Sequence, residues 1–190
     1  GPPASPPQPE GIWWIRDAKS PVYKTSVGEE RYRRSLYTIW RRSYLHPSLA
    51  NFDAPDRITC AVDRDRTNTP LQALTLLNDP IYLEAAFGLA RRLSDEPAIV
   101  TTEQRIIHGF RLATSRKPTE NERDLLMRLF RSRLDRFKAD PKSAYKLIES
   151  ARGELAAGIS PINPTAAAEL AAWLQVANVL LNLDETITKG

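Results

Sequence analysis

The sequence predicts a mainly α-helical protein, in which an irregular helical domain is built around a buried C-terminal helix and follows a loop-rich N-terminal region. Two observations predict this class. Helix-start signals recur along the chain, and between them apolar residues repeat at spacings of three and four. The 190 residues are 42% hydrophobic and 26% charged. That composition excludes wholesale disorder, a collagen-type fibre and an integral membrane protein.

Helix starts are marked by Ser, Thr, Asp or Asn followed by proline, or by Glu or Gln three residues later. The sites with this pattern are Ser26, Thr69, Asp79, Thr101, Thr119, Asp140 and Asn163. We expect a helix after each, the first running from about Val27 to Ser43, although Ser35 to Trp40 is also rich in strand-favouring residues. Residues Ile58 to Val62 are the best short strand candidate, and one strand cannot make a sheet.

The last predicted helix, from Pro164 to about Leu183, is apolar nearly all round, which indicates a central, buried element. Its uncharged run from Leu170 to Leu183 is too short and too polar to span a membrane. The amides of Gln175, Asn178 and Asn182 fall on one face of this helix. Either they bond to neighbouring backbone or to a packed loop, which we favour, or they line a polar pocket.

The domain organisation follows from a change in composition near the start. Residues 1–11 contain five prolines and read as an arm or linker, which the adjacent Trp13 and Trp14 would pin to the body. Residues 12–190 form one helical domain, with a loop-rich part at 12–69 and a helical core at 70–190. Residues 105–138 carry ten Lys and Arg against four Asp and Glu, so they form a basic region.

The densest polar stretch lies between Phe52 and Pro70, where aspartates alternate with arginines. Such a loop could supply a general acid and base, but an Asp/Arg network that fixes the loop is the commoner cause of this pattern. Asp79 already has a role as a helix cap, which lowers the need for a catalytic one. We therefore favour a structural network and lean against an enzyme.

A single cysteine, Cys60, excludes an intrachain disulfide, a Cys-rich zinc site and a haem-attachment motif, so we expect no cofactor in this chain. Cys60 itself is expected to be a small buried hydrophobe. Arginines surround Tyr32, Tyr37 and Trp40, but no nucleic-acid-binding motif is present. We therefore expect these arginines to lie on solvent-exposed faces. The sequence thus predicts no nucleic-acid partner and no metal.

Several segments together resemble a known family. They are Tyr32–Thr38, His46–Leu49, Phe52–Arg57, Arg66–Leu74, Leu76–Pro80 and Ala177–Glu185. They resemble the C-terminal half of a planctomycete domain of unknown function found in large cytochrome c-associated proteins. The resemblance implies export to the periplasm or cell surface, a haem-binding segment upstream in the parent protein, and no established activity. Since the chain starts at Gly1, we expect a processed product or a piece of a longer protein.

The leading hypothesis is a non-catalytic docking or scaffold module that contacts upstream domains of the parent protein. Its candidate binding residues are Arg34, Arg57, Arg66, Asn68, Gln175, Asn178 and Asn182. The alternative is a domain that binds or cleaves an extracellular polysaccharide. In that alternative the carboxylates are Asp53, Asp56 and Asp79, and the tryptophans form a sugar platform.

Overall fold

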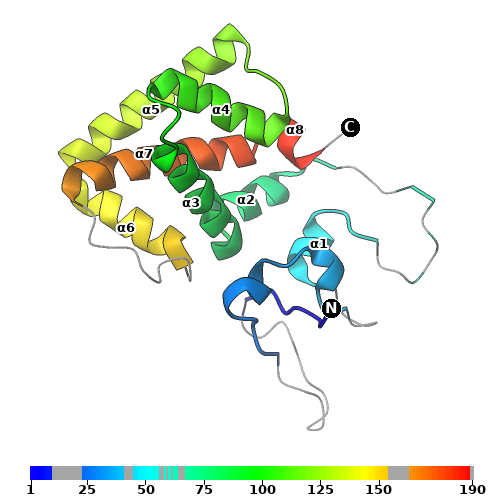
Figure 1. Ribbon diagram of the computed structural model, residues 1–190. Coiled ribbons are helices and arrows are strands. Elements are labelled where there is room, and N and C mark those ends of the chain that lie inside the picture. Colours follow the sequence, from blue (N-terminus) through cyan, green and yellow to red (C-terminus); the bar gives the residue numbers. More distant parts are fainter. Residues whose placement is uncertain are drawn as a thin grey trace. The chain divides into compact units, whose positions relative to one another are not determined.

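The computed structural model describes residues 1–9, 23–40, 45–55, 58, 60, 62–63, 67–153 and 163–188 (Figure 1). This part of the chain is mainly helical, as the sequence predicts, and its only β-type pairing is an isolated parallel bridge between Ala4 and Thr38. The chain divides into two compact units, Gly1–Gln72 and Ala73–Gly190.

The first unit contains short helices separated by irregular chain. They are the 3-10 helices η1 (Gly28–Tyr32) and η2 (Ser35–Tyr37), the helix α1 (Pro47–Asn51), and the start of α2 (Pro70–Asn78). The prediction of one helix from Val27 to Ser43 is wrong, because η1 and η2 are separate and residue 33 between them is extended. Ser26 does not cap η1, since its hydroxyl accepts the Ser5 N–H instead.

Two further expectations for this unit fail within the described residues. Ile58, Cys60 and Val62 have no strand structure, so the strand candidate is wrong where it can be followed. Cys60 is exposed and not buried. Among the described residues no strand pairs with this run, and an unpaired strand gains no ladder hydrogen bonds.

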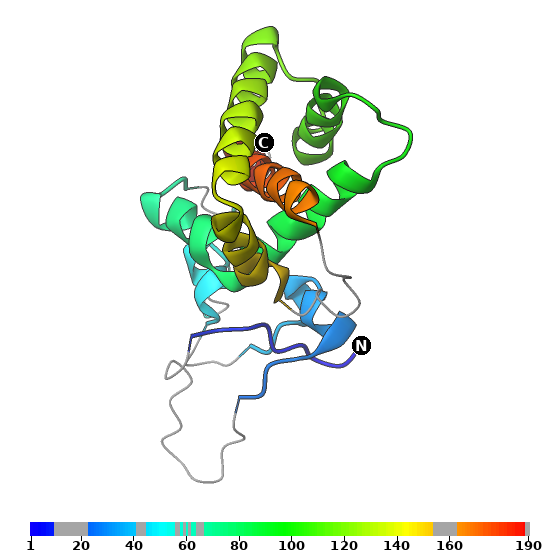
Figure 2. The ribbon, with the colours of Figure 1, turned by 90° about the vertical axis from the view of Figure 1, so that its left-hand side faces the viewer.

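The second unit is a helical bundle (Figure 2). Its helices are α3 (Pro80–Asp95), α4 (Thr102–Thr114), α5 (Glu120–Ala139), α6 (Pro141–Arg152), α7 (Pro164–Leu181) and α8 (Asp184–Ile187). Five helices of this unit begin at a predicted cap. They are α3, α4, α5, α6 and α7. At Thr101 and Thr119 both bonds of the capping box form.

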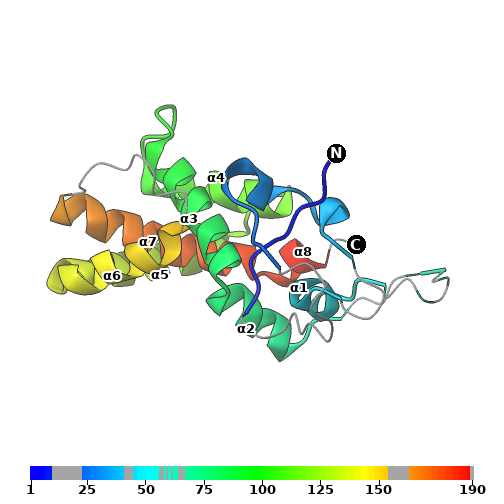
Figure 3. The same ribbon diagram turned by 90° about the horizontal axis from the view of Figure 1, so that it is seen from below.

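Helix α7 is the centre of the second unit, as its apolar sequence predicts. It packs against α3, α5 and α6, and its neighbours α5 and α6 lie alongside it in Figure 3. Trp173, Leu174 and Leu180 are fully buried. The Trp173 ring lies 4.3 Å from the Phe130 ring of α5, centroid to centroid. Alanines along α7 are also buried, which lets the surrounding helices approach closely.

Within the described residues, no helix combines the length and the apolar character needed to cross a membrane.

Candidate functional site

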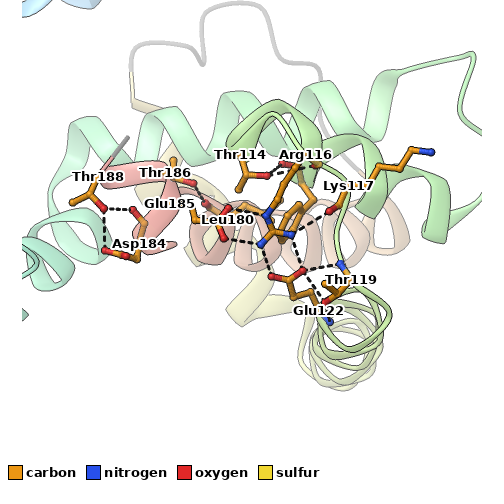
Figure 4. A network of polar contacts seen from close by, with 11 residues as sticks. Thr114, Arg116, Lys117, Thr119, Glu122, Leu180, Asp184, Glu185, Thr186 and Thr188 are labelled. Carbon is orange, nitrogen blue, oxygen red and sulfur yellow. Dashed lines mark hydrogen bonds and ion pairs between the residues drawn. The ribbon is translucent and has the colours of Figure 1, made fainter. Parts of the chain in front are cut away.

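Among the described residues of the second unit, the densest ionic cluster is centred on Arg116, in the turn between α4 and α5 (Figure 4). Its guanidinium donates to both carboxylate oxygens of Glu122, at 2.7 and 2.9 Å. It also donates to both oxygens of Glu185 on α8, at 2.6 and 2.8 Å. Glu122 in turn accepts the backbone N–H of Thr119 at 2.7 Å. One arginine thus joins the α4–α5 turn to α8.

These contacts hold all three groups in their charged forms. Hydrogen bonds from Arg116, and then from the Thr119 backbone, lower the pKa of Glu122 to about 2. The Arg116 guanidinium also lowers the pKa of Glu185, and the two carboxylates raise the pKa of Arg116. A carboxylate that stays ionised and fully bonded near neutral pH is a poor proton donor. This cluster is therefore a structural clamp.

An open groove of about 760 Å³ runs along α5 beside the start of α4. Arg123 lines it and pairs with Glu103 of α4 at 3.3 Å and with Asp124 at 2.9 Å. Those carboxylates raise the pKa of Arg123. Arg128 and Arg131 also line the groove. Both are exposed, and neither pairs with any other described residue.

The predicted carboxylate Asp53 belongs to a filled network in the first unit. Its Oδ2 accepts the N–H and the hydroxyl of Thr67, at 2.9 and 2.7 Å. The amide of Gln72, a side chain only 1% exposed, donates to Asn51 O at 2.8 Å and to Thr67 Oγ1 at 3.0 Å. Asp53 and Gln72 thus tie the loop after α1 to the start of α2.

The other predicted carboxylates give no open catalytic pair among the described residues. Asp79 caps α3 and accepts the Ile81 N–H at 3.0 Å, while Asp56 lies outside the described part of the chain. With Asp53 and Asp79 both bonded within their own units, the arrangement offers no support to the polysaccharide alternative.

The predicted binding residues are placed only in part. Arg34 is exposed just before η2, where its carbonyl accepts the Tyr37 N–H, and Asn68 is exposed just before α2. Arg57 and Arg66 lie outside the described residues, as do Trp13 and Trp14.

The three amides of α7 lie on its half-buried strip. Asn182 is the C-cap, and its backbone N–H donates to Val179 O at 3.1 Å. The side chains of Gln175 and Asn178 make no hydrogen bond to other described residues. Because both are partly exposed, water can satisfy them, and they need no partner inside the protein.

Metal-ligand geometry is absent from the described part of the chain, where no cluster of three or more His, Cys, Asp or Glu side chains could hold an ion. His46, buried in the first unit, accepts the Ser48 N–H at Nδ1 and faces the Pro7 carbonyl with Nε2. That carbonyl can only accept, so Nε2 carries the proton.

Fold and site together define a helical protein in which several carboxylates bond to its own turns and helix ends. The family model PSD1, described as a protein of unknown function (DUF1553), matches residues 1–130, and the chain belongs to this family. This confirms the resemblance to a domain of unknown function. No curated protein and no solved structure matches the chain.

Sequence reasoning identified Thr119 and Glu122 as a capping box but missed the clamp around Arg116. Glu185 lies 69 residues after Arg116, and no spacing rule connects them. The pattern at Thr69 predicts a capping bond with Gln72, three residues later. It gives no sign that Gln72 also bonds to the Asn51 carbonyl, 21 residues earlier.

Proposed function

We propose that this chain is a non-catalytic docking module, without a cofactor of its own, in an exported, cytochrome c-associated protein. The observation that carries the proposal is the groove along α5. Its two exposed arginines, Arg128 and Arg131, pair with no other described residue, whereas the carboxylates Asp53, Asp79 and Glu122 are bonded within the protein. Ionic groups bonded in this way hold a fold together, while unpaired ones are free to meet a partner.

The groove favours an acidic segment as its occupant. Arginine guanidiniums bind carboxylates in a two-pronged geometry and are common in protein interfaces. Leu125, which also lines the groove, is 57% exposed and offers an apolar contact. The segment we propose belongs to the part of the parent protein that precedes this chain.

Export and the association with cytochrome c are supported by the family resemblance and not by geometry. They predict that the parent protein is found in the periplasm or at the cell surface. Fractionation of cells that express the parent protein tests this, and recovery only from the cytoplasm would contradict it.

The docking proposal is tested by titrating the chain with the upstream half of the parent protein in a calorimeter. In Arg128→Glu/Arg131→Glu the affinity should fall at least tenfold, because two favourable charge contacts become repulsive. Arg136→Glu/Lys138→Glu is the matched control, since it makes the same change of charge at two exposed positions on α5 that do not line the groove.

The outcome separates docking from general charge attraction. An equal loss of affinity in the control would show that only net charge matters. If the upstream half does not bind the unchanged chain, or binds the double variant equally well, the proposal is wrong.

A further inference from the structure

In the first unit, the proline-rich start of the chain lies between two segments that follow it in sequence. On one side the Ala4 N–H donates to Tyr37 O at 2.7 Å and the Ile39 N–H donates to Ala4 O at 2.9 Å. On the other side Ser5 exchanges two bonds with Ser26, whose N–H donates to Ser5 O at 2.8 Å and whose Oγ accepts the Ser5 N–H at 2.9 Å. Adjacent arm residues thus bond to opposite flanks, as in a central strand.

The prolines around this centre are bonded through their carbonyls. The pairs are Arg33 with Pro2, Tyr23 with Pro6 and His46 with Pro7. Proline has no N–H, and an extended proline-rich chain has no internal hydrogen bonds, so its carbonyls need outside donors. Three side chains from separate places in the sequence supply those donors.

The fit at the centre depends on small side chains. Ala4 is only 3% exposed and Ser5 only 8%. The Arg33 guanidinium that bonds the arm also stacks on the Tyr37 ring, 4.1 Å from its centroid, which fixes the direction of its donors. The flanking residues therefore select an extended segment with small residues between prolines.

We propose that Tyr23, Ser26, Arg33, His46 and the backbone of residues 37–39 form a receptor site for a Pro-Pro-Ala-Ser-Pro-Pro segment. The chain fills the site with its own arm, and the arm of a second copy can replace it. This site is separate from the groove on α5, and the proposal does not depend on the docking function. Main-chain bonds with pockets for particular side chains are a known mode of recognition for extended peptides.

The tethered arm should act as a built-in competitor. A short tether gives it an effective concentration of about 1 mM, which masks the site from added ligand. Changing Ala4 to Glu would place an unpaired charge in a buried position and release the arm. The receptor site itself would be unchanged in that variant.

The first test uses a fluorescently labelled peptide with the sequence of residues 1–9 and the full chain in solution. By fluorescence anisotropy the peptide should bind Ala4→Glu saturably and bind the unchanged chain at least tenfold more weakly. The matched control is Pro9→Ala, since Pro9 is exposed, and it should behave as the unchanged chain. A peptide that itself carries Glu at position 4 should not bind any of the three chains.

The second test asks whether a second copy can supply the arm. Tyr23→Phe/Ser26→Ala/Arg33→Ala weakens the site and leaves a normal arm, whereas Ala4→Glu leaves a normal site. Mixed, the two variants should form a one-to-one complex in analytical ultracentrifugation, and the free peptide should dissociate it. Peptide binding without this complex would overturn the claim that a second copy fills the site.

Failure of the peptide to bind Ala4→Glu, with its helical circular dichroism unchanged, overturns the receptor site itself. Equal binding to Ala4→Glu and to the unchanged chain overturns the role of Ala4. If Ala4→Glu loses its fold, Pro2→Gly/Pro6→Gly/Pro7→Gly takes its place, because glycine makes ordering of the arm more costly. The same peptide readout then decides.

Discussion

Two glycines in neighbouring helices of the second unit should respond in opposite ways to alanine. Gly109 of α4 is buried, and a Cβ there would lie 2.9 Å from Leu93 Cδ1 and 3.2 Å from Leu180 Cδ1. Both leucines are fully buried and have little room to move. Gly88 of α3 has open space at the same position, with nothing within 4 Å.

The magnitudes follow from helix propensity and over-packing. Alanine is about 1 kcal/mol more favourable than glycine inside a helix, so Gly88→Ala should raise the free energy of unfolding by roughly that amount. Gly109→Ala gains the same term but over-packs the contact between α4, α3 and α7, which costs about 1–3 kcal/mol. The difference between the two variants isolates the over-packing cost.

Urea unfolding followed by helical circular dichroism measures this difference, provided that the slope with denaturant is unchanged. As a further check, Leu93→Ala should be about 1–3 kcal/mol less damaging when Gly109 is already alanine, because it removes the clash. Gly109→Ala as stable as Gly88→Ala would refute the close approach of α4.

Substitutions at three other positions test separate contacts. Glu122→Gln should lower the free energy of unfolding by about 1 kcal/mol at pH 7. The pKa of Glu122 is about 2 in the folded protein and ordinarily 4.5. The loss of stability in Glu122→Gln, relative to the unchanged chain, should therefore be complete above pH 4.5 and vanish as the pH falls towards 2. Gln72→Ala should cost about 2–3 kcal/mol and speed hydrogen exchange in residues 45–55, because it removes a buried amide together with its bonds to Asn51 O and Thr67 Oγ1. Trp173→Ala should cost about 3–5 kcal/mol in thermal or urea unfolding. Trp173→Phe should cost much less, since it keeps the contact with Phe130 and the buried indole N–H has no acceptor to lose.

Matched controls make these results decisive. Glu120→Gln changes an exposed carboxylate in the same turn as Glu122 that does not bond to Arg116, and at pH 7 it should cost less stability than Glu122→Gln. Gln104→Ala removes an exposed capping-box partner and should cost less than Gln72→Ala, because Gln72 itself is buried. A Glu122→Gln effect that persists unchanged at pH 2, or equal costs at the two glutamines, would contradict the contacts described above.

The features that the sequence predicts best are those formed by residues that lie close together in the chain. Thr119 and Glu122, or Asp140 and Ser143, need only one turn of chain to form a cap, so their pattern is visible in the sequence. The burial of helix α7 could also be predicted from the sequence, because apolar residues occupy most of its surface.

The failures have the opposite cause. Ser26 carries a cap pattern, yet its N–H and hydroxyl bond to Ser5, 21 residues earlier, and η1 begins without a side-chain cap. Likewise, Arg116 in the turn between α4 and α5 bonds to Glu185 of α8, 69 residues later. Contacts between distant residues depend on the complete fold, and local patterns carry no information about them.

The place of α7 in the chain also bears on how the protein is made. A ribosome that adds about 5–20 residues per second produces α3, α4, α5 and α6 several seconds before the helix that they surround. During that interval the apolar faces meant for Trp173 and its neighbours have nothing to cover them. The nascent bundle is then prone to aggregate. Synthesis in the presence of a chaperone that covers such apolar faces should therefore improve the yield of folded protein.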